Sequence, residues 1–201
     1  MKKILSGILL FLISFCFSQK KVIDAQIITQ DNDTLDVKIR VTVNMIDPTL
    51  IYGSSFNEKI NIVDESGKKS KMEATNVKEL SFVDFGGKKR YFLNRSENKK
   101  TLQERLFNGN TIEWFRDYYA SGPGGEGAAD FLFNKVAKKG IGVAYFTGLP
   151  KKKLIEFFND EPEMESFIQE AKTSSLRQAE NNVNSVMESL LEKYESLKSR
   201  K

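Results

Sequence analysis

Hydrophobic and polar residues alternate without interruption along residues 34–44, TLDVKIRVTVN. Every second position from Leu35 to Val43 is apolar, and the positions between them are polar. Successive side chains of a β-strand point to opposite faces, so this pattern predicts a long strand with one buried and one solvated face. The predicted solvated face carries three charged side chains: Asp36, Lys38 and Arg40.

Shorter segments of the same kind lie on both sides of this strand. Alternation and apolar content predict strands at residues 22–30, 59–64, 70–75, 77–85 and 88–94. The turns between them contain Asp, Asn, Ser and Gly, which tolerate the backbone conformations that tight turns need. Short strands joined by tight turns predict an antiparallel β-rich module over residues 19–95, folded as a small barrel or a sandwich.

Residues 96–148 contain two further predicted hairpins, and we expect this module to pack on the first. One hairpin is built around Asn108-Gly109, the strongest short hairpin signal, and its second strand, residues 110–119, has aromatic residues on both faces. A strand that is apolar on both sides is usually covered on both sides. The other hairpin joins residues 130–136 to 141–146, and it follows a Gly-rich segment, 121–129, that we interpret as a flexible connection.

The spacing of apolar residues becomes helical after Pro150, so residues 149–201 are predicted to be a helical region and the fold class α+β. The last predicted helix, from 174 to about 197, has a seam with a seven-residue period. Two interpretations of this seam are open: docking on the nearly bare strand face at Gly142 and Ala144, which we favour, or self-association as a short coiled coil. The seam residues that form this possible interface are Leu176, Val183, Val186, Leu190 and Leu197.

The first 18 residues are predicted to be a secretory signal peptide. A basic start, Met1-Lys2-Lys3, precedes the apolar run from Ile4 to Phe17 and a small residue, Ser18. Phe15 is bulky where a lipoprotein needs a small residue before its cysteine, which disfavours lipidation of Cys16. No other apolar run is long enough to span a membrane, so we expect an exported protein in the periplasm or associated with the cell envelope.

Composition limits the chemistry that this chain can perform. It has no histidine, and its one cysteine, Cys16, lies in the predicted signal peptide, which excludes His-based triads, thiol catalysis and His- or Cys-ligated zinc. The net charge is +4, but Lys2 and Lys3 supply two of those charges, so charge is a weak argument for a polyanionic partner. We therefore predict no cofactor, no metal, no catalytic residues and no nucleic-acid partner.

Two groups of residues could form a binding surface. Lysines cluster at several predicted turns, as in Lys88-Lys89-Arg90, and could contact anionic lipid or polysaccharide if the turns lie together. Aromatic residues of the 110–119 strand could form a platform for sugars, although a core strand explains them as well. The candidate surface residues are Trp114, Tyr118, Lys88, Lys89 and Arg90.

The order of the segments resembles that of a known family. A signal peptide is followed by QIITQDNDTLDVKI, KINIVDESGKK, ATNVKELSF and RLFNGNTIEWF, with helices after LPKKKLIEFFND. This layout resembles a family of uncharacterised exported envelope proteins of Bacteroidota-type bacteria. The resemblance implies a periplasmic or envelope location, an SH3-like β-rich front and a helical tail. It transfers no functional residues.

Together these observations favour a non-enzymatic envelope protein that acts as a binding or structural module. Its partner would be an envelope protein or a polysaccharide, and self-association through the last helix is a further possibility. The alternative is a hydrolase of carbohydrate or peptide substrates that uses carboxylates, because Asp and Glu are plentiful. No spacing in the sequence identifies a catalytic pair.

Overall fold

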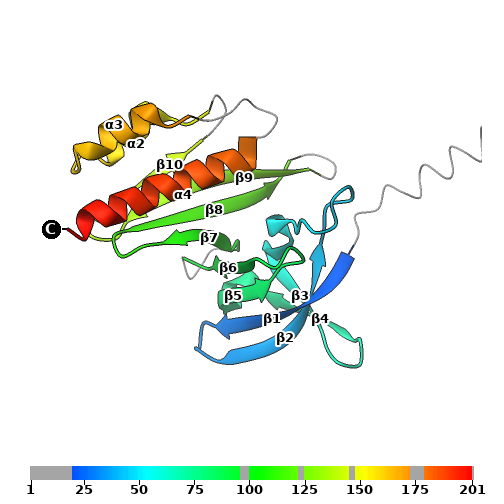
Figure 1. Cartoon of the computed structure of the whole chain (residues 1–201). Coiled ribbons are helices and arrows are strands. Elements are labelled where there is room, and N and C mark those ends of the chain that lie inside the picture. Colours follow the sequence, from blue (N-terminus) through cyan, green and yellow to red (C-terminus); the bar gives the residue numbers. More distant parts are fainter. Residues whose placement is uncertain (1–19, 96–99, 122–124, 145–147, 173–178, 201) are drawn as a thin grey trace, which may run out of the picture. The chain divides into compact units, whose positions relative to one another are not determined.

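The computed structural model describes residues 20–95, 100–121, 125–144, 148–172 and 179–200 (Figure 1). The chain divides into two compact units. Unit 1 consists of Met1–Leu102 and Tyr118–Gly127, and unit 2 of Gln103–Asp117 and Ala128–Lys201. The two units are interleaved along the chain: it leaves unit 1 after Leu102 and returns to it for Tyr118–Gly127.

Unit 1 is an antiparallel sheet with two short 3-10 helices, η1 (Gly53–Phe56) and η2 (Ala74–Asn76). The pairing order within the unit is β6-β5-β1-β2-β3-β4. The strands are β1 (Lys20–Thr29), β2 (Thr34–Thr42), β3 (Lys59–Val63), β4 (Lys69–Glu73), β5 (Val77–Val83) and β6 (Lys89–Leu93). They match the predicted strands to within a few residues at each end.

The alternation along β1 and β2 defines the buried face of this sheet. Ile27, Ile39, Val41 and Val43 are fully buried, whereas the polar residues between them are exposed or half-buried. The segment between β2 and β3 supplies Phe56, whose ring lies 5.4 Å from that of Phe82 and 4.8 Å from that of Phe92. The rest of the unit 1 core consists of Ala25, Ile51, Ile60, Ala74, Val77, Leu80 and Leu102.

The fold class is α+β with an antiparallel sheet, as predicted, but an SH3-like barrel is not confirmed. The pairing order of unit 1 is linear, with β6 and β4 at its two ends. Among the described residues these two strands do not pair with each other, so the sheet does not close into a barrel. The sheet of unit 1 therefore presents one face to its core and leaves the charged face of the β1–β2 hairpin exposed.

Unit 2 combines strands with the three α-helices of the described ranges. Its strands are β7 (Gln103–Asn108), β8 (Ile112–Ala120), β9 (Glu126–Asn134) and β10 (Lys139–Val143), paired in the order β10-β9-β8-β7. The last residues of β8 and the first of β9 belong to unit 1. The helices are α2 (Lys151–Phe157), α3 (Glu163–Glu170) and α4 (Ala179–Lys198).

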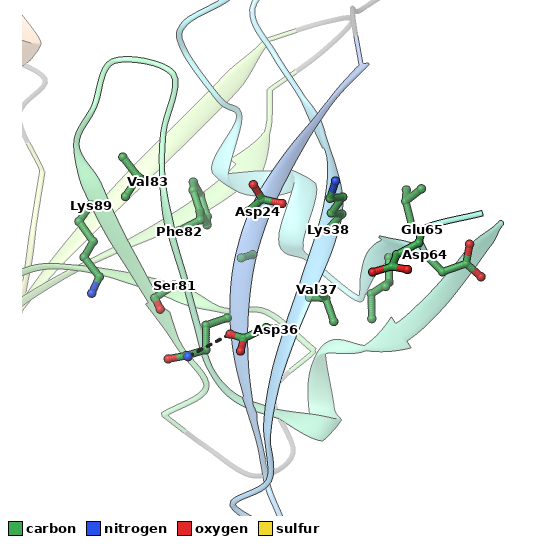
Figure 2. A pocket seen from close by; sticks show the side chains of 14 residues that line it. Asp24, Asp36, Val37, Lys38, Asp64, Glu65, Ser81, Phe82, Val83 and Lys89 are labelled. Atoms are coloured by element: carbon green, nitrogen blue, oxygen red, sulfur yellow. Dashed lines mark hydrogen bonds between the residues drawn. The ribbon is translucent and has the colours of Figure 1, made fainter. Parts of the chain in front are cut away.

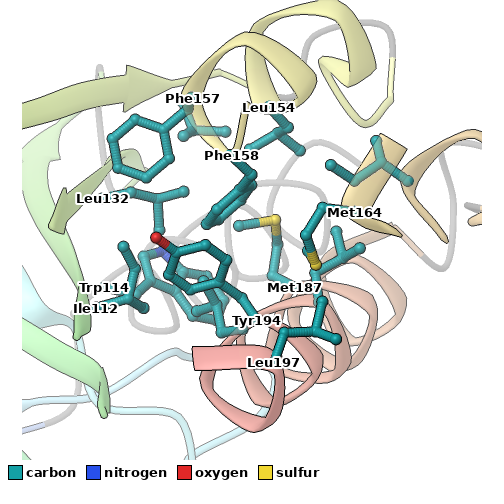
Figure 3. Close-up of a cluster of buried hydrophobic side chains, with 14 of the residues drawn as sticks. Ile112, Trp114, Leu132, Leu154, Phe157, Phe158, Met164, Met187, Tyr194 and Leu197 are labelled. Atoms are coloured by element: carbon teal, nitrogen blue, oxygen red, sulfur yellow. The ribbon is translucent and has the colours of Figure 1, made fainter. Parts of the chain in front are cut away.

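The helices of unit 2 pack on the strands around one apolar core (Figure 3). Trp114 and Ile112 of β8, with Leu132 of β9, are fully buried beneath side chains from the helices. The helical side chains in this core are Leu154, Phe157, Met164, Ile168, Val183, Met187, Leu190, Leu191, Tyr194 and Leu197. The predicted two-sided burial of the 110–119 strand is confirmed, since Trp114 and its neighbour Phe115 are both buried.

Two local predictions are wrong. The 121–129 segment is not simply a connection, because β9 begins at Glu126, although residues 122–124 lie outside the described part of the chain. The bare strand face at Gly142 does not receive a helix either. Gly142 is exposed, and the neighbouring Val143 faces the core instead. Burying one valine gains more apolar contact than burying a glycine face, which decides the orientation of β10.

None of the helices in the described ranges has the length and apolar content that a membrane-spanning segment requires. Residues 1–19, which contain the predicted signal peptide, lie outside those ranges.

Candidate functional site

The exposed face of the unit 1 sheet carries a hollow of about 750 Å³ (Figure 2). The strand register explains which side chains reach it. Gln26 of β1 lies opposite Asp36 of β2, and Asp24 lies opposite Lys38, so alternate residues of the hairpin point together away from the core. On the other side of β1, Ser81 of β5 lies opposite Gln26 and joins the same face.

Three elements besides the β1–β2 hairpin complete the lining. Residues 62–65 at the end of β3 close one side, and β5 with Lys89 of β6 closes the other. The full lining is Asp24, Ala25, Gln26, Asp36, Val37, Lys38, Ile62, Val63, Asp64, Glu65, Ser81, Phe82, Val83 and Lys89.

The lining is acidic although the whole chain is basic. It contains the carboxylates of Asp24, Asp36, Asp64 and Glu65 against the ammonium groups of Lys38 and Lys89 only. All six of these side chains are exposed. A concave surface with an excess of carboxylates attracts cations, an effect that salt weakens.

Hydrogen bonds hold two of these carboxylates in place. Gln26 Nε2 donates to Asp36 Oδ1 across the hairpin at 3.1 Å. Asp64 Oδ1 accepts from the Ser66 hydroxyl at 2.6 Å and from the Lys68 backbone N–H at 2.9 Å. The Ser66 hydroxyl and then the Lys68 N–H lower the pKa of Asp64 below 3.8, because both stabilise the ionised carboxylate. Asp64 therefore stays negative at any pH near neutrality.

The hollow is not organised as a metal centre. Within the described ranges, no three Asp, Glu, His or Cys side chains are grouped so that they could hold a metal ion. The acids of the hollow are spread over β1, β2 and the end of β3, which suits an extended ligand better than a single ion.

The candidate surface residues do not form one surface. Trp114 is fully buried in unit 2, where its indole N–H donates to Asp130 at 2.9 Å. It is therefore not available as a sugar platform, because its ring is covered by the core and its one hydrogen-bond donor is satisfied there. Lys88 and Lys89 are exposed, and Lys89 is the one candidate that lines the hollow.

Arg90 and Tyr118 have structural roles in unit 1. The Arg90 side chain is 9% exposed, and its guanidinium lies 5.1 Å from the ring centre of Phe92 and 6.0 Å from that of Tyr118. It donates to the carbonyl oxygen of Ile51 at 3.2 Å and to the Tyr118 hydroxyl at 3.3 Å. A buried guanidinium that stacks on rings and satisfies a backbone carbonyl stabilises the core and is not offered to a ligand.

The seam of the last helix is covered by its own unit. Val183, Leu190 and Leu197 are buried in the core of unit 2, and Val186 packs against that core. The fifth seam residue, Leu176, lies outside the described part of the chain. The docking interpretation therefore accounts for the four described seam residues, although the contact is not at Gly142.

Sequence reasoning found the charged face of β2 but did not identify the hollow. Asp36 and Lys38 are visible in the alternating pattern, yet Asp24, Gln26 and Ser81 join them only through the strand pairing of β1 with β2 and β5. The alternation of β1 is imperfect, with apolar Val22 and Ile28 on the polar face, so no solvated side of β1 could be predicted.

No known protein family, no curated protein and no solved structure matches this chain.

Proposed function

We propose that this protein is an exported, non-enzymatic module of the cell envelope that binds a basic segment of a partner protein in the hollow of unit 1. The observation that carries the proposal is the excess of carboxylates in a concave lining on a chain of net positive charge. The predicted signal peptide supports the location.

The shape of the hollow favours an extended segment over a small molecule. It is open and its lining comes from five strands, with charged groups next to apolar ones such as Val63 and Val83. Lysine or arginine side chains of a partner could pair with Asp24 and Asp36 while their methylene stems lie on the apolar positions. Exposed pairs of this kind contribute up to about 1 kcal/mol each, so binding is expected to be moderate and salt-dependent.

A photo-crosslinking experiment tests this function. A photoreactive phenylalanine analogue replaces Val83, which lines the hollow and is 53% exposed. The matched control carries it at Val136, which is 75% exposed in unit 2. With a lysine-rich peptide, the Val83 variant should form an adduct that excess unlabelled peptide suppresses, and the Val136 variant should not.

Equal adducts at both positions, or none at Val83, would contradict the proposal. The hydrolase alternative predicts a different result. Purified protein would then turn over a polysaccharide or peptide, and Asp24→Asn together with Asp36→Asn would abolish that turnover. We expect no turnover on a panel of such substrates.

A further inference from the structure

A second surface of unit 1 has a different character, because apolar side chains protrude from it. The loop between β2 and η1 exposes three of them: Met45 is 49% exposed, Ile46 91% and Leu50 56%. Isolated exposed hydrophobic residues are ordinary, but three within six residues on one loop form a small apolar surface.

The loop is ordered by its own polar groups. Asn44 Oδ1 accepts the backbone N–H groups of Ile46 and Asp47, at 2.8 and 3.0 Å. Asp47 Oδ1 accepts the hydroxyl and the backbone N–H of Thr49, at 2.6 and 3.0 Å. The Asn44 N–H donates to the Leu50 carbonyl oxygen at 2.8 Å, which closes the loop. These polar groups are thus satisfied internally while the apolar side chains point outward.

Lys21 joins this loop to a second one. Its Nζ donates to the Pro48 carbonyl oxygen at 3.1 Å and lies 4.7 Å from the centre of the Phe85 ring. Phe85 belongs to the turn between β5 and β6, and the register of β1 with β5 brings this turn to the end where β1 begins. Figure 1 shows the β2–η1 loop beside the start of β1.

This end of unit 1, which we name the tip, combines exposed apolar side chains and three lysines with two carboxylates, those of Asp47 and Asp84. The acid of its second turn, Asp84, accepts the backbone N–H groups of Gly86 and Lys88, at 3.0 and 2.9 Å, so it is engaged within its own turn. The tip consists of Met45, Ile46, Leu50 and Phe85, with the lysines Lys20, Lys21 and Lys88.

We propose that the tip docks on the surface of a lipid bilayer that contains anionic lipids. Ile46, with Met45 and Leu50, would enter the interfacial region, and the lysines would lie among the phosphate groups. Backbone groups that are already hydrogen-bonded can enter a poorly hydrated region at low cost, whereas an open loop cannot. Lysines near an anionic surface add about 1 kcal/mol each.

The place where the chain enters unit 1 supports this occupant. The apolar run from Ile4 to Phe17 precedes β1, and residue 19 joins Lys20 at the tip. Removal of the predicted signal peptide would leave the positively charged N-terminus of the exported chain next to Lys20 at the tip, where it adds to the basic groups. The acidic hollow is a separate surface, so this inference does not depend on the proposed function.

Vesicle co-sedimentation of residues 20–201 tests the inference, since both hydrophobic cores consist of residues within this range. The protein should bind vesicles of phosphatidylglycerol and phosphatidylcholine in equal parts, and binding should weaken with added salt. Ile46→Asp should weaken binding about tenfold, because it replaces an inserting apolar group by an anion. The matched control, Val136→Asp, changes a β-branched apolar residue of unit 2 that is 75% exposed and should bind like the parent.

A second variant gives a direct signal of insertion. Ile46→Trp should show a blue shift of its emission with anionic vesicles, whereas the parent, whose single tryptophan is buried, should not. Equal vesicle binding by Ile46→Asp and the parent would overturn the proposal. So would an absence of vesicle binding, or a dimer that Ile46→Asp dissociates, since the tip would then be a contact between two copies of the chain.

Discussion

Arg116 and Asp130 form a buried, bidentate ion pair in unit 2. Arg116 Nε lies 2.6 Å from Asp130 Oδ1, and its Nη2 lies 2.9 Å from Oδ2. The same guanidinium donates to Asn184 Oδ1 of α4 at 2.9 Å, and Asp130 also accepts the indole N–H of Trp114. The pair therefore links β8, β9 and α4 at the edge of the apolar core.

Removing one partner of this pair should destabilise unit 2 strongly. Arg116→Met leaves the Asp130 carboxylate buried with its countercharge gone, which typically costs about 3–5 kcal/mol. Urea unfolding followed by Trp114 fluorescence measures the effect, because this single tryptophan lies in the core of unit 2.

The double variant Arg116→Met/Asp130→Leu is the control for this prediction. It removes both charges and should lose less stability than the two single variants together, because no unpaired charge remains. Additive losses would mean that the two side chains do not depend on each other.

Glu195 of α4 should be needed to fix the β7–β8 turn. Its carboxylate accepts the backbone N–H groups of Asn110, Thr111 and Ile112, at 3.0 Å or less. Glu195→Ala leaves these donors without their acceptor and should cost about 2 kcal/mol, the scale of charge-assisted hydrogen bonds. Glu192→Ala, an exposed position on the same helix, should change stability little.

Amide hydrogen exchange localises this effect. The amides of residues 110–112 should exchange faster in Glu195→Ala than in Glu192→Ala. Unchanged protection of these amides would show that α4 does not hold the turn.

The stability of unit 2 should fall in alkaline solution. Tyr194 donates to Asp160 at 2.9 Å, and Lys198 lies 2.7 Å from both Asp160 and Glu161. Burial and then the Asp160 carboxylate raise the pKa of Tyr194 above 10.0. Burial alone would lower the pKa of Lys198, but hydrogen bonds to Asp160 and Glu161 raise it above 10.5.

Raised pKa values mean that the folded state binds these protons more tightly than the unfolded chain. The resulting stability is complete below the ordinary pKa values and is lost as pH rises above about 10. Lys198→Met should make this alkaline loss less steep, and Lys193→Met, which removes only an exposed pair with Glu163, should not. Alkaline unfolding profiles that are identical for the parent and Lys198→Met would contradict this.

The same network should also lose stability in acid, where the group that changes its charge is the Asp160 carboxylate. Burial would raise the pKa of Asp160, but hydrogen bonds from Lys198 and Tyr194 lower it below 3.8. The stability that the Asp160 carboxylate contributes is therefore present above pH 3.8 and is lost as pH falls through the lowered pKa. Asp160→Asn should flatten the acid side of the stability profile measured by Trp114 fluorescence.

Packing of the helix seam makes a further prediction about assembly. Leu190 is fully buried in the core of unit 2, so Leu190→Ala should cost about 2–5 kcal/mol through lost apolar contacts and the cavity it leaves. The size of the native particle in sedimentation should not change. Dissociation of an oligomer by Leu190→Ala, without loss of stability, would favour the self-association alternative.

The strands and helices of this fold could be predicted because local signals agree with tertiary packing. The alternation from Leu35 to Val43, the Asn108-Gly109 turn and the helical period after Pro150 all matched the structure. β10 was predicted as a strand, but its small residues predicted a helix against the Gly142 face, whereas the burial of Val143 turns the opposite face toward the core. The start of β9 was not predicted, because a high glycine content indicates a loop even where the backbone is paired in a sheet.

The hollow was hidden from sequence because it depends on register. Asp24 and Lys38 are 14 positions apart, and their opposition requires the pairing of β1 with β2. Conversely, Trp114 and Arg90 were candidates because their side chains are typical of binding sites, yet each has partners inside a core. Residue type alone does not separate a core aromatic or guanidinium from an exposed one.

The most direct test of the proposed function is a calorimetric titration of residues 20–201 with a lysine-rich peptide. The parent should bind saturably, and Asp24→Asn/Asp36→Asn should bind about tenfold more weakly, since it removes two carboxylates of the lining. The control Asp31→Asn/Asp33→Asn makes the same change of charge at the exposed turn of the same hairpin and should bind like the parent. Equal weakening in both double variants, or no binding by the parent, would contradict a basic partner segment in the hollow.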